Sequence, residues 1–554
     1  MRDTPYRDTA PLGSVRVMHM MKISRVLGAS AVAAVLTAGL TAAPSRAETP
    51  VAPVAAAAPK AVRGDLTGDG KADLAVYGGF YGGGQEIQLI PGGAVGTLGR
   101  GAAAVNQNDP GIPLRNDPAR FEEFGTALAY GDFNADGRTD LAVGAPFATV
   151  GGVVSAGAVT VLYGRAGAPY YTRAKVFTQN TPGVPDPAEA SDRFSDVLAA
   201  GDFDGDGYAD LAVGAPLEDV GSKADAGSVT VLRGGASGLT ATGARVLTQD
   251  TGGVPGTAGL RSRFGERLAT GNLAGTPADE LVVVAPYDPA PAGTPEFICT
   301  GPGGTSQRSR PAGSVTVLRG GTGGPLTRTG AQYLTSAKLA LGSITGGLSY
   351  SATTAVTGRL YGGTYADLAV SGKYANGGKC NEGAVAVVRG GKNGLPATAT
   401  TVLTAANAGR PRVEGTLFGA DLAVGDVDGS GIPDLLAISR RTSDGEHDTP
   451  GYAALLFGST RGPATAGRFT WAAAQDTDPH LTGGALLDVD GDRTAELVLT
   501  APIATTESDR DTGILYVLKL KKTGTSAGIT AWQRVRRGSL GTAGHNGPVG
   551  PIAH

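Results

Sequence analysis

The sequence predicts an all-β repeat protein, and three observations support this fold class. One phrase recurs seven times, and its clearest copy is GDFDGDGYADLAVGAP at residues 201–216. Self-similarity at a regular spacing indicates stacked supersecondary units. The apolar runs are short, rich in Val and Leu, and bounded by Gly, Pro and Asp, which is typical of strands, whereas helix signals are sparse.

The N-terminal segment is typical of an export signal. Lys22 and Arg25 precede an apolar stretch at 26–43, and small residues at Ser45 and Ala47 suit cleavage after Ala47. An uncleaved membrane anchor is the alternative, but we expect a secreted chain with no stable membrane insertion. The expected segments are an over-extended start at 1–20, a signal peptide at 21–47, a linker at 48–60, the repeats at 61–536 and a flexible tail at 537–554.

Each repeat contains a nine-residue loop, and successive loops start 62 to 87 residues apart. An apolar run such as LAVGAP follows the loop directly, and a second recurring text, such as AGSVTVLRGG, comes later in the repeat. We therefore expect about four short strands in each repeat. The loops lie at 65–73, 132–140, 202–210, 272–280, 359–367, 426–434 and 488–496.

The composition argues against some classes of function. The 554 residues carry a formal net charge of −3 and no basic stripe, so nothing favours binding to nucleic acid. No Gly-x-Ser-x-Gly elbow or metalloprotease helix occurs, so we assign no catalytic residue. Polar side chains on loops can still meet in space, and enzyme activity stays an open alternative that we disfavour.

Five of the loops place oxygen-bearing side chains at positions one, three, five and nine. Calcium binds six to eight oxygens, and alternate residues of a tight loop can all point inward. Glycine at position six, as in Gly207, permits the sharp turn that returns position nine to the ion. The predicted ligands are Asp65, Thr67, Asp69 and Asp73; Asp132, Asn134, Asp136 and Asp140; Asp202, Asp204, Asp206 and Asp210; Asp426, Asp428, Ser430 and Asp434; and Asp488, Asp490, Asp492 and Glu496.

Two other interpretations of these loops, as solvated turns or as EF-hand or dockerin loops, agree less well with the sequence. Asp and Gly are common in solvated turns, but three or four carboxylates within nine residues would repel one another without a cation. An EF-hand or dockerin loop needs a helix after it, and here a strand-like run follows.

The residues Arg63-Gly64-Asp65 spell an adhesion tripeptide. Asp65 is also the first predicted ligand of the first loop, so we expect it to coordinate calcium rather than to take part in recognition.

The seven loops are not equivalent. The loops at 272–280 (NLAGTPADE) and 359–367 (RLYGGTYAD) are degenerate and are predicted to be metal-free. In the seventh loop Arg493 replaces the glycine, which we expect to strain the turn and weaken that site. The sequence therefore predicts about five calcium sites.

The repeat resembles the FG-GAP repeat of the N-terminal propeller of integrin alpha subunits. The two halves of that name occur as Phe124-Gly125, Phe264-Gly265 and Phe418-Gly419 before the loop, and as Gly144-Ala145-Pro146 and Gly214-Ala215-Pro216 after it. The resemblance implies a seven-bladed β-propeller of four-stranded blades, with calcium loops between the first and second strands. It covers roughly 61–536, which is almost the whole mature chain.

The two cysteines, Cys299 and Cys380, fall in the fourth and fifth repeats, which would be neighbouring blades. Both lie between the second and third strands expected there, so a disulfide between them is predicted, with two free thiols as the alternative.

The resemblance supports architecture and calcium, not the full function of an integrin. Our leading hypothesis is a monomeric binding or adhesion module for an extracellular protein or glycan. Its ligand surface would lie on the loops after each second strand, among which 287–311 is the longest. The alternatives are a carbohydrate-active propeller, either a lectin or a polysaccharide lyase or hydrolase, and a structural repeat of the cell envelope.

Overall fold

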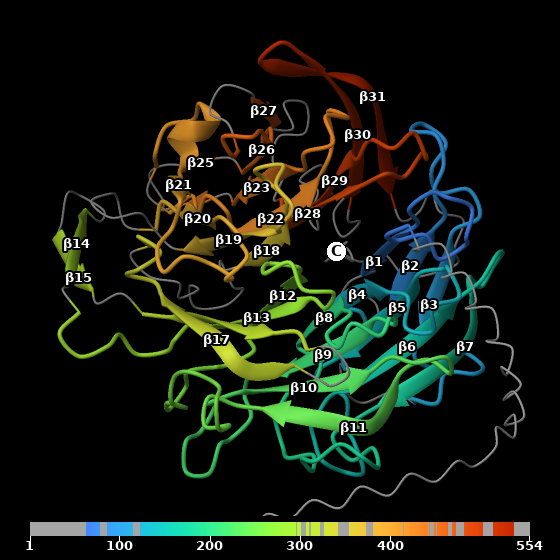
Figure 1. Ribbon diagram of the computed structural model, residues 1–554. Coiled ribbons are helices and arrows are strands. Elements are labelled where there is room, and N and C mark those ends of the chain that lie inside the picture. Colours follow the sequence, from blue (N-terminus) through green and yellow to red (C-terminus); the bar gives the residue numbers. More distant parts are fainter. Residues whose placement is uncertain are drawn as a thin grey trace, which may run out of the picture. The chain divides into compact units, whose positions relative to one another are not determined.

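The computed structural model is all-β, as predicted (Figure 1). It describes residues 62–77, 86–114, 122–294, 296–300, 306–309, 312–321, 326–341, 354–372, 381–413, 415–440, 442–443, 448–449, 451–463, 468–471, 481–501 and 514–536. The signal peptide, linker and tail predicted from the sequence lie outside these residues. Among the described residues, no helix is long and apolar enough to cross a membrane.

The strands form antiparallel sheets in chain order, with about four strands per repeat. The first sheet contains β1 (Leu74–Tyr77), β2 (Glu86–Ile90) and β3 (Ala103–Asn106). The second contains β4 (Leu128–Gly131), β5 (Asp140–Ala145), β6 (Ala158–Gly164) and β7 (Tyr171–Phe177). The third contains β8 (Val197–Gly201), β9 (Asp210–Ala215), β10 (Ser228–Arg233) and β11 (Thr240–Leu247).

The fourth and fifth sheets follow the same order. The fourth contains β12 (Arg267–Gly271), β13 (Glu280–Ala285), β16 (Ser314–Arg319) and β17 (Thr327–Thr335). A hairpin of β14 (Phe297–Thr300) and β15 (Ser306–Ser309) is inserted between β13 and β16. The fifth contains β18 (Ala355–Gly358), β19 (Asp367–Gly372), β20 (Ala384–Val388) and β21 (Thr401–Leu403), followed by the 3₁₀ turn η2 (Ala405–Ala408).

The last two repeats join into one eight-stranded sheet through a parallel pairing of β27 with β31 at Arg468 and Ser526. The sixth repeat supplies β22 (Asp421–Gly425), β23 (Asp434–Ser439), β26 (Tyr452–Leu456) and β27 (Arg468–Trp471), with a small hairpin of β24 (Thr442–Ser443) and β25 (Asp448–Thr449). The seventh supplies β28 (Gly483–Leu487), β29 (Glu496–Ala501), β30 (Ile514–Thr523) and β31 (Ser526–Arg536).

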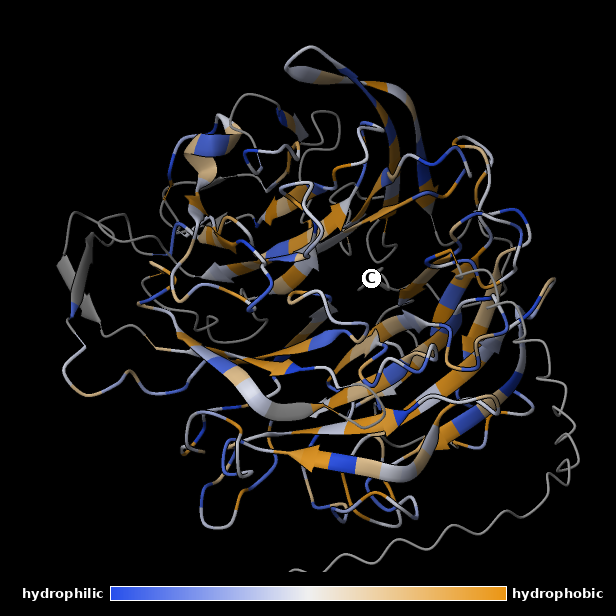
Figure 2. Cartoon of the chain, viewed as in Figure 1, coloured by the Kyte–Doolittle hydropathy of each residue, from blue (hydrophilic) through white to orange (hydrophobic). Residues whose placement is uncertain are grey.

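In every repeat, the strand that follows the loop is buried along its whole length. All six residues of β5, β9, β13, β19, β23 and β29 are buried, whereas β7 and β11 at the sheet edge are partly exposed. Hydrophobic colour accordingly runs along the inner strands in Figure 2. A strand buried on both faces is one packed between two neighbouring layers, so each sheet packs against the next repeat.

Consecutive repeats are joined by the same backbone hydrogen bond at the loop end of their sheets. The amide at loop position eight donates to the carbonyl at loop position one of the preceding repeat, and the series returns from the seventh loop to the first. The bonds are Thr139 to Asp65, Ala209 to Asp132, Asp279 to Asp202, Ala366 to Asn272, Ala495 to Asp426 and Ala72 to Asp488, at 2.7 to 3.0 Å. The junction between the fifth and sixth repeats lacks this bond, because Pro433 at position eight of the sixth loop has no N–H to donate.

A second junction lies at the opposite end of the sheets and explains the Phe of the repeated phrase. The amides of Phe194, Phe264 and Phe418 donate to the carbonyl oxygen two residues before the third strand of the preceding repeat, which belongs to Ala156, Ala226 and Glu382 respectively. The next residue there is Gly157, Gly227 or Gly383, each with φ between 80° and 89°. An added methyl group at Gly227 would lie 2.3 Å from the carbonyl oxygen of Phe264, so the close approach of two repeats requires glycine.

The two halves of the repeated phrase are in direct contact within one repeat. The amide of the residue after the Phe donates to the first residue of the Gly-Ala-Pro segment, as from Gly125 to Gly144 at 2.8 Å. Ser195 takes this glycine's place in the third repeat at φ 78°. Its hydroxyl donates to Ala158 at 2.6 Å and accepts from Ala145 at 3.1 Å, bonds to the preceding repeat that offset the strained backbone.

Candidate metal centres

In the five acidic loops, the position-one carboxylate organises the turn. Both oxygens of Asp202 accept backbone hydrogen bonds, from Gly205 at 2.7 Å, Asp206 at 3.1 Å and Gly207 at 3.0 Å. Asp65, Asp132, Asp426 and Asp488 accept from corresponding amides. The backbone is thus wrapped around one carboxylate, and the following alternate side chains face the same point.

Three of the five acidic loops bring carboxylates together. Oxygens within 4.8 Å of one another come from Asp202, Asp204 and Asp206 in the third loop, Asp426, Asp428 and Asp434 in the sixth, and Asp488, Asp490 and Asp492 in the seventh. The first and second loops have Thr67 and Asn134 at position three, so fewer carboxylates meet there.

The donor set fits calcium. Within the described part of the chain, the buried oxygens Asp204 Oδ1 and Asp490 Oδ1 have no hydrogen-bond partner. Both belong to position three, the place from which a ligand side chain reaches an ion in such a loop. A buried carboxylate oxygen without a donor is costly, and a hard cation bound by several oxygens removes that cost.

Position nine has a structural role in every repeat, whether or not the loop is acidic. Asp210 accepts from Phe203 at 3.0 Å and from Gly234 at 2.8 Å, so it ties the loop to the end of the third strand. Asp367, in a degenerate loop, makes the same two bonds, to Tyr361 and Gly390. Asp73, Asp140 and Asp434 repeat the pattern, and Glu496 accepts from Val489.

The position-nine carboxyls have raised pKa values, chiefly because of burial and also because of the acids beside them. The pKa is raised to about 8 in Asp140, to about 7 in Asp210, Asp434 and Glu496, and to about 6 in Asp73. A positive charge nearby would therefore favour the ionised form of these groups at neutral pH.

Three basic side chains reach into the acidic loops, which the sequence analysis missed. Arg233 pairs with Asp204, and Lys522 pairs with Asp428. Lys519 pairs with Asp490, with Asp492 at 2.6 Å and with Glu496 at 3.6 Å. Arg233 and Lys519 lie on the third strand of the repeat that holds their loop, whereas Lys522 lies on the third strand of the seventh repeat and pairs with the sixth loop. The available signal was the basic residue near the end of these strands. They partly neutralise the third, sixth and seventh loops, and the seventh most.

The degenerate loops keep the turn but fill position three with hydrophobic side chains. Asn272 replaces the first acid and still accepts from Gly275 at 2.6 Å. Position three is buried Ala274 in the fourth loop and buried Tyr361 in the fifth. In these two loops, a buried hydrophobic side chain thus occupies the position at which the acidic loops have a predicted ligand.

Other residues singled out by the sequence are placed as follows. Asp65 of the Arg-Gly-Asp tripeptide is buried and bonded within its loop, so it is not presented as a recognition residue. The predicted disulfide lies outside the described residues, because Cys380 and the side chain of Cys299 are not among them.

Comparison with known proteins identifies the repeat. The FG-GAP repeat model matches residues 124–162 and 194–232, from the Phe before the first strand through the third strand. Phosphatidylinositol-glycan-specific phospholipase D of Rattus norvegicus is 31% identical over 172 residues, 30% of this chain and 19% of that protein. Integrin alpha-3 of Mus musculus is 29% identical over 167 residues, 29% of this chain and 15% of that protein.

A further relative, integrin alpha pat-2 of Caenorhabditis briggsae, is 39% identical over 124 residues, 21% of this chain and 10% of that protein. The matching segments thus span a fifth or less of these three relatives. The chain contains FG-GAP repeats and is distantly homologous to integrin alpha chains and to phosphatidylinositol-glycan-specific phospholipase D.

Proposed function

We propose that the chain is a secreted, calcium-stabilised, seven-bladed β-propeller that acts as a binding or adhesion module for an extracellular protein or glycan. The observation that supports the propeller best is the series of position-eight hydrogen bonds, which occurs at six of the seven junctions and includes the return from the seventh loop to the first. A series that returns to its first repeat suits radial packing, which leaves only short protected edges.

Calcium is proposed as a structural ion in the loops from Asp65, Asp132, Asp202, Asp426 and Asp488. At an affinity of about 0.1 mM and about 1 mM calcium, typical of extracellular modules, one site would stabilise the fold by about 1.4 kcal/mol. Five sites would contribute about 7 kcal/mol, comparable to the net stability of a domain.

Chelation should therefore lower the melting temperature strongly. Differential scanning calorimetry of the secreted chain in 1 mM calcium and in excess chelator measures this. Magnesium added back serves as the control, because its octahedral preference suits a flexible loop poorly. A melting temperature unchanged by chelator would contradict a structural role for calcium.

The ligand surface is proposed on the segments after the second strands, at the sheet ends opposite the calcium loops. These segments differ most between repeats, and the fourth repeat carries the β14–β15 hairpin there, set apart from β13 and β17 in Figure 1. Variable loops on a rigid scaffold are the usual place of recognition.

The test is binding of the full chain to glycan arrays and to extracellular proteins, with and without the hairpin. Replacing 296–309 by a short Gly-Ser turn should abolish binding while the melting temperature stays the same. Retention of binding by this variant would move the site elsewhere, and absence of binding by the parent chain would overturn the binding role. Release of product from a polysaccharide would instead favour the lyase or hydrolase alternative.

A further inference from the structure

A recurring position at the end of the third strand lies beside the loop of its own repeat. In the seventh repeat, Leu518 pairs with Leu497 of the strand after the loop, and Lys519 follows Leu518. The same register recurs in every sheet, so this strand-end position can be assigned in all seven repeats. It is occupied in chain order by Pro91, Tyr163, Arg233, Arg319, Arg389, Phe457 and Lys519.

The side chain at the strand-end position reaches position three of the loop. Arg233 pairs with Asp204 and Lys519 pairs with Asp490, and both acids are at position three. In the fifth repeat, the guanidinium of Arg389 lies 5.1 Å from the ring centre of Tyr361, which also occupies position three. The register of the third strand therefore sets which side chain faces this predicted ligand position.

In the sixth repeat, a lysine of the neighbouring repeat does the same. The strand-end residue is Phe457, and the ammonium of Lys522 lies 4.6 Å from the centre of its ring. Lys522 pairs there with Asp428, the acid at position three of the sixth loop. All three acids at position three thus have a basic partner.

The loops without an acid at position three do not have this pairing. Thr67 and Asn134 hold position three in the first and second loops, where the strand-end residues are Pro91 and Tyr163. Asn134 instead donates to Asp136 of its own loop at 3.0 Å.

In the fourth repeat, position three is Ala274, and Arg319 donates to the carbonyl of Asn393 at 2.6 Å. A basic side chain therefore enters the loop only where an acid at position three is present to pair with it.

The seventh loop holds its basic side chain by the most contacts. The ammonium of Lys519 lies beside Asp490, 2.6 Å from Asp492 and 3.6 Å from Glu496, which are three of the four predicted calcium ligands. An ammonium is a compact charge with three donors, and calcium binds carboxylate oxygens at 2.3–2.6 Å. The two cations therefore compete for the same oxygens. Asp490 Oδ1 has no hydrogen-bond partner among the described residues, so the loop still attracts calcium.

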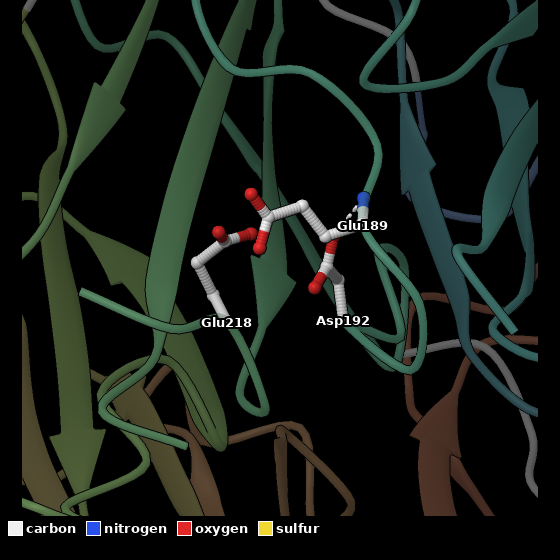
Figure 3. Close-up of side chains that lie close together, drawn as sticks. All are labelled: Glu189, Asp192 and Glu218. Carbon is white, nitrogen blue, oxygen red and sulfur yellow. Dashed lines mark hydrogen bonds between the residues drawn. The ribbon is translucent and has the colours of Figure 1, made fainter. Parts of the chain in front are cut away.

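Acids at the opposite end of the sheets are neutralised in another way. Glu189, Asp192 and Glu218 each bring one carboxylate oxygen within 4.8 Å of the others (Figure 3). The charged groups that act on Glu218 are acids, and burial together with these acids raises the pKa of Glu218 to about 9. Glu218 is therefore protonated at neutral pH and accepts a hydrogen bond from Gln179 at 2.7 Å. A proton serves there, whereas a basic side chain serves in the loops.

We propose that Lys519 takes the place of calcium in the seventh loop and lowers the calcium affinity of that loop. Arg233 and Lys522 act in the same way but more weakly in the third and sixth loops, because they contact fewer of the acids. The first and second loops then bind calcium most tightly and the seventh least. This inference rests on the proposed calcium sites. Because Ala72 donates to Asp488 at 2.8 Å, the lysine would hold the seventh loop against the first repeat when calcium is low.

The test is Lys519→Met in the full chain, which keeps the length of the side chain and removes its charge. Amide hydrogen exchange is followed over a calcium titration at 488–496, with 132–140 as the internal reference. In the parent, 488–496 should be protected in chelator and respond only at higher calcium than 132–140. In K519M, its exchange in chelator should rise and its calcium midpoint should fall by about tenfold or more. The control K521M removes the same charge from an exposed position of the same strand and should leave the midpoint unchanged.

A second variant guards against misfolding of K519M, which leaves Asp490 without its basic partner. Asp490→Asn combined with Lys519→Tyr reproduces the Asn134 and Tyr163 pair of the second repeat. Its midpoint at 488–496 should move toward that of 132–140. An unchanged midpoint in both variants, while 132–140 still responds to calcium, would overturn the role of Lys519 and leave the calcium sites standing. No response to calcium in any loop would overturn the calcium sites, and this inference with them.

Discussion

At the scale of single residues, the backbone conformation at position six of the acidic loops decides which residue type is favoured there. Gly70, Gly137, Gly207 and Gly431 adopt φ between 79° and 91°, and Arg493 is forced to 73° in the seventh loop. A side chain in this left-handed region costs about 1 kcal/mol or more.

Arg493→Gly should therefore stabilise the protein by about 1 kcal/mol in urea unfolding. The measurement is made in excess chelator, so that the change reports the backbone and not calcium affinity. Gly207→Ala is the converse control. An added methyl group meets nothing within 4 Å there, so the loss of about 1 kcal/mol would come from φ alone. Equal stability of R493G and the parent would show that the turn is unstrained.

The raised pKa values at position nine predict how stability depends on pH. Folded-state pKa values of about 8 in Asp140 and about 7 in Asp210 and Asp434 exceed the ordinary 3.8, so the folded state holds more protons between these values. Without calcium, stability should then be highest near pH 4 and fall as pH rises to about 8.

Thermal melts in chelator across pH 5 to 8 measure this trend, and saturating calcium should remove or reverse it, because calcium binds the ionised form. Asp140→Asn, which cannot titrate, should flatten the fall in chelator. A melting temperature that rises with pH in chelator would contradict the assignment.

At the scale of elements, glycine before the third strand decides how closely two repeats approach. Gly227→Ala would place a methyl group 2.3 Å from the carbonyl oxygen and 2.5 Å from the nitrogen of Phe264. We expect a loss of about 3 kcal/mol in urea unfolding, because backbone must move on both sides of the junction. Gly207→Ala, which has a similar positive φ and meets nothing within 4 Å, is the matched control. Equal stability of the two variants would rule out this junction.

The elements were more predictable than their side-chain environments. The strands, the loops and the special position of Arg493 followed from local patterns, because turn and strand chemistry depends on near neighbours. The pairing of Lys519 with the seventh loop did not, since it depends on the register of β30 beside β29. The cluster of Asp192 and Glu218 also depends on how two repeats dock, which alternation in a single strand does not encode.

At the scale of the whole molecule, the junction of the seventh repeat with the first differs from the others because no chain connects them directly. Gln533 on β31 accepts from Gly96 at 2.8 Å and Leu98 at 2.9 Å, and donates to Leu98 at 2.8 Å. Gln332 on β17 makes the same contact with Leu395 of the next repeat. The two glutamines are therefore a matched pair, one at a connected junction and one at the closure.

Gln533→Ala should destabilise the chain by about 3 kcal/mol, since three hydrogen bonds worth about 1 kcal/mol each are lost. The loss of these bonds should also loosen the rest of the junction between the seventh and first repeats. Amide exchange should rise at Gly96 and Leu98, and also at Ala72 and Gly93, whose amides donate to the seventh loop at 2.8 Å and 2.7 Å. Gln332→Ala should raise exchange only near Leu395, because the chain still holds the fourth and fifth repeats together. Equally local effects in both variants would mean that the seventh and first repeats are held by the loop backbone bonds alone, and that their junction does not depend on β31.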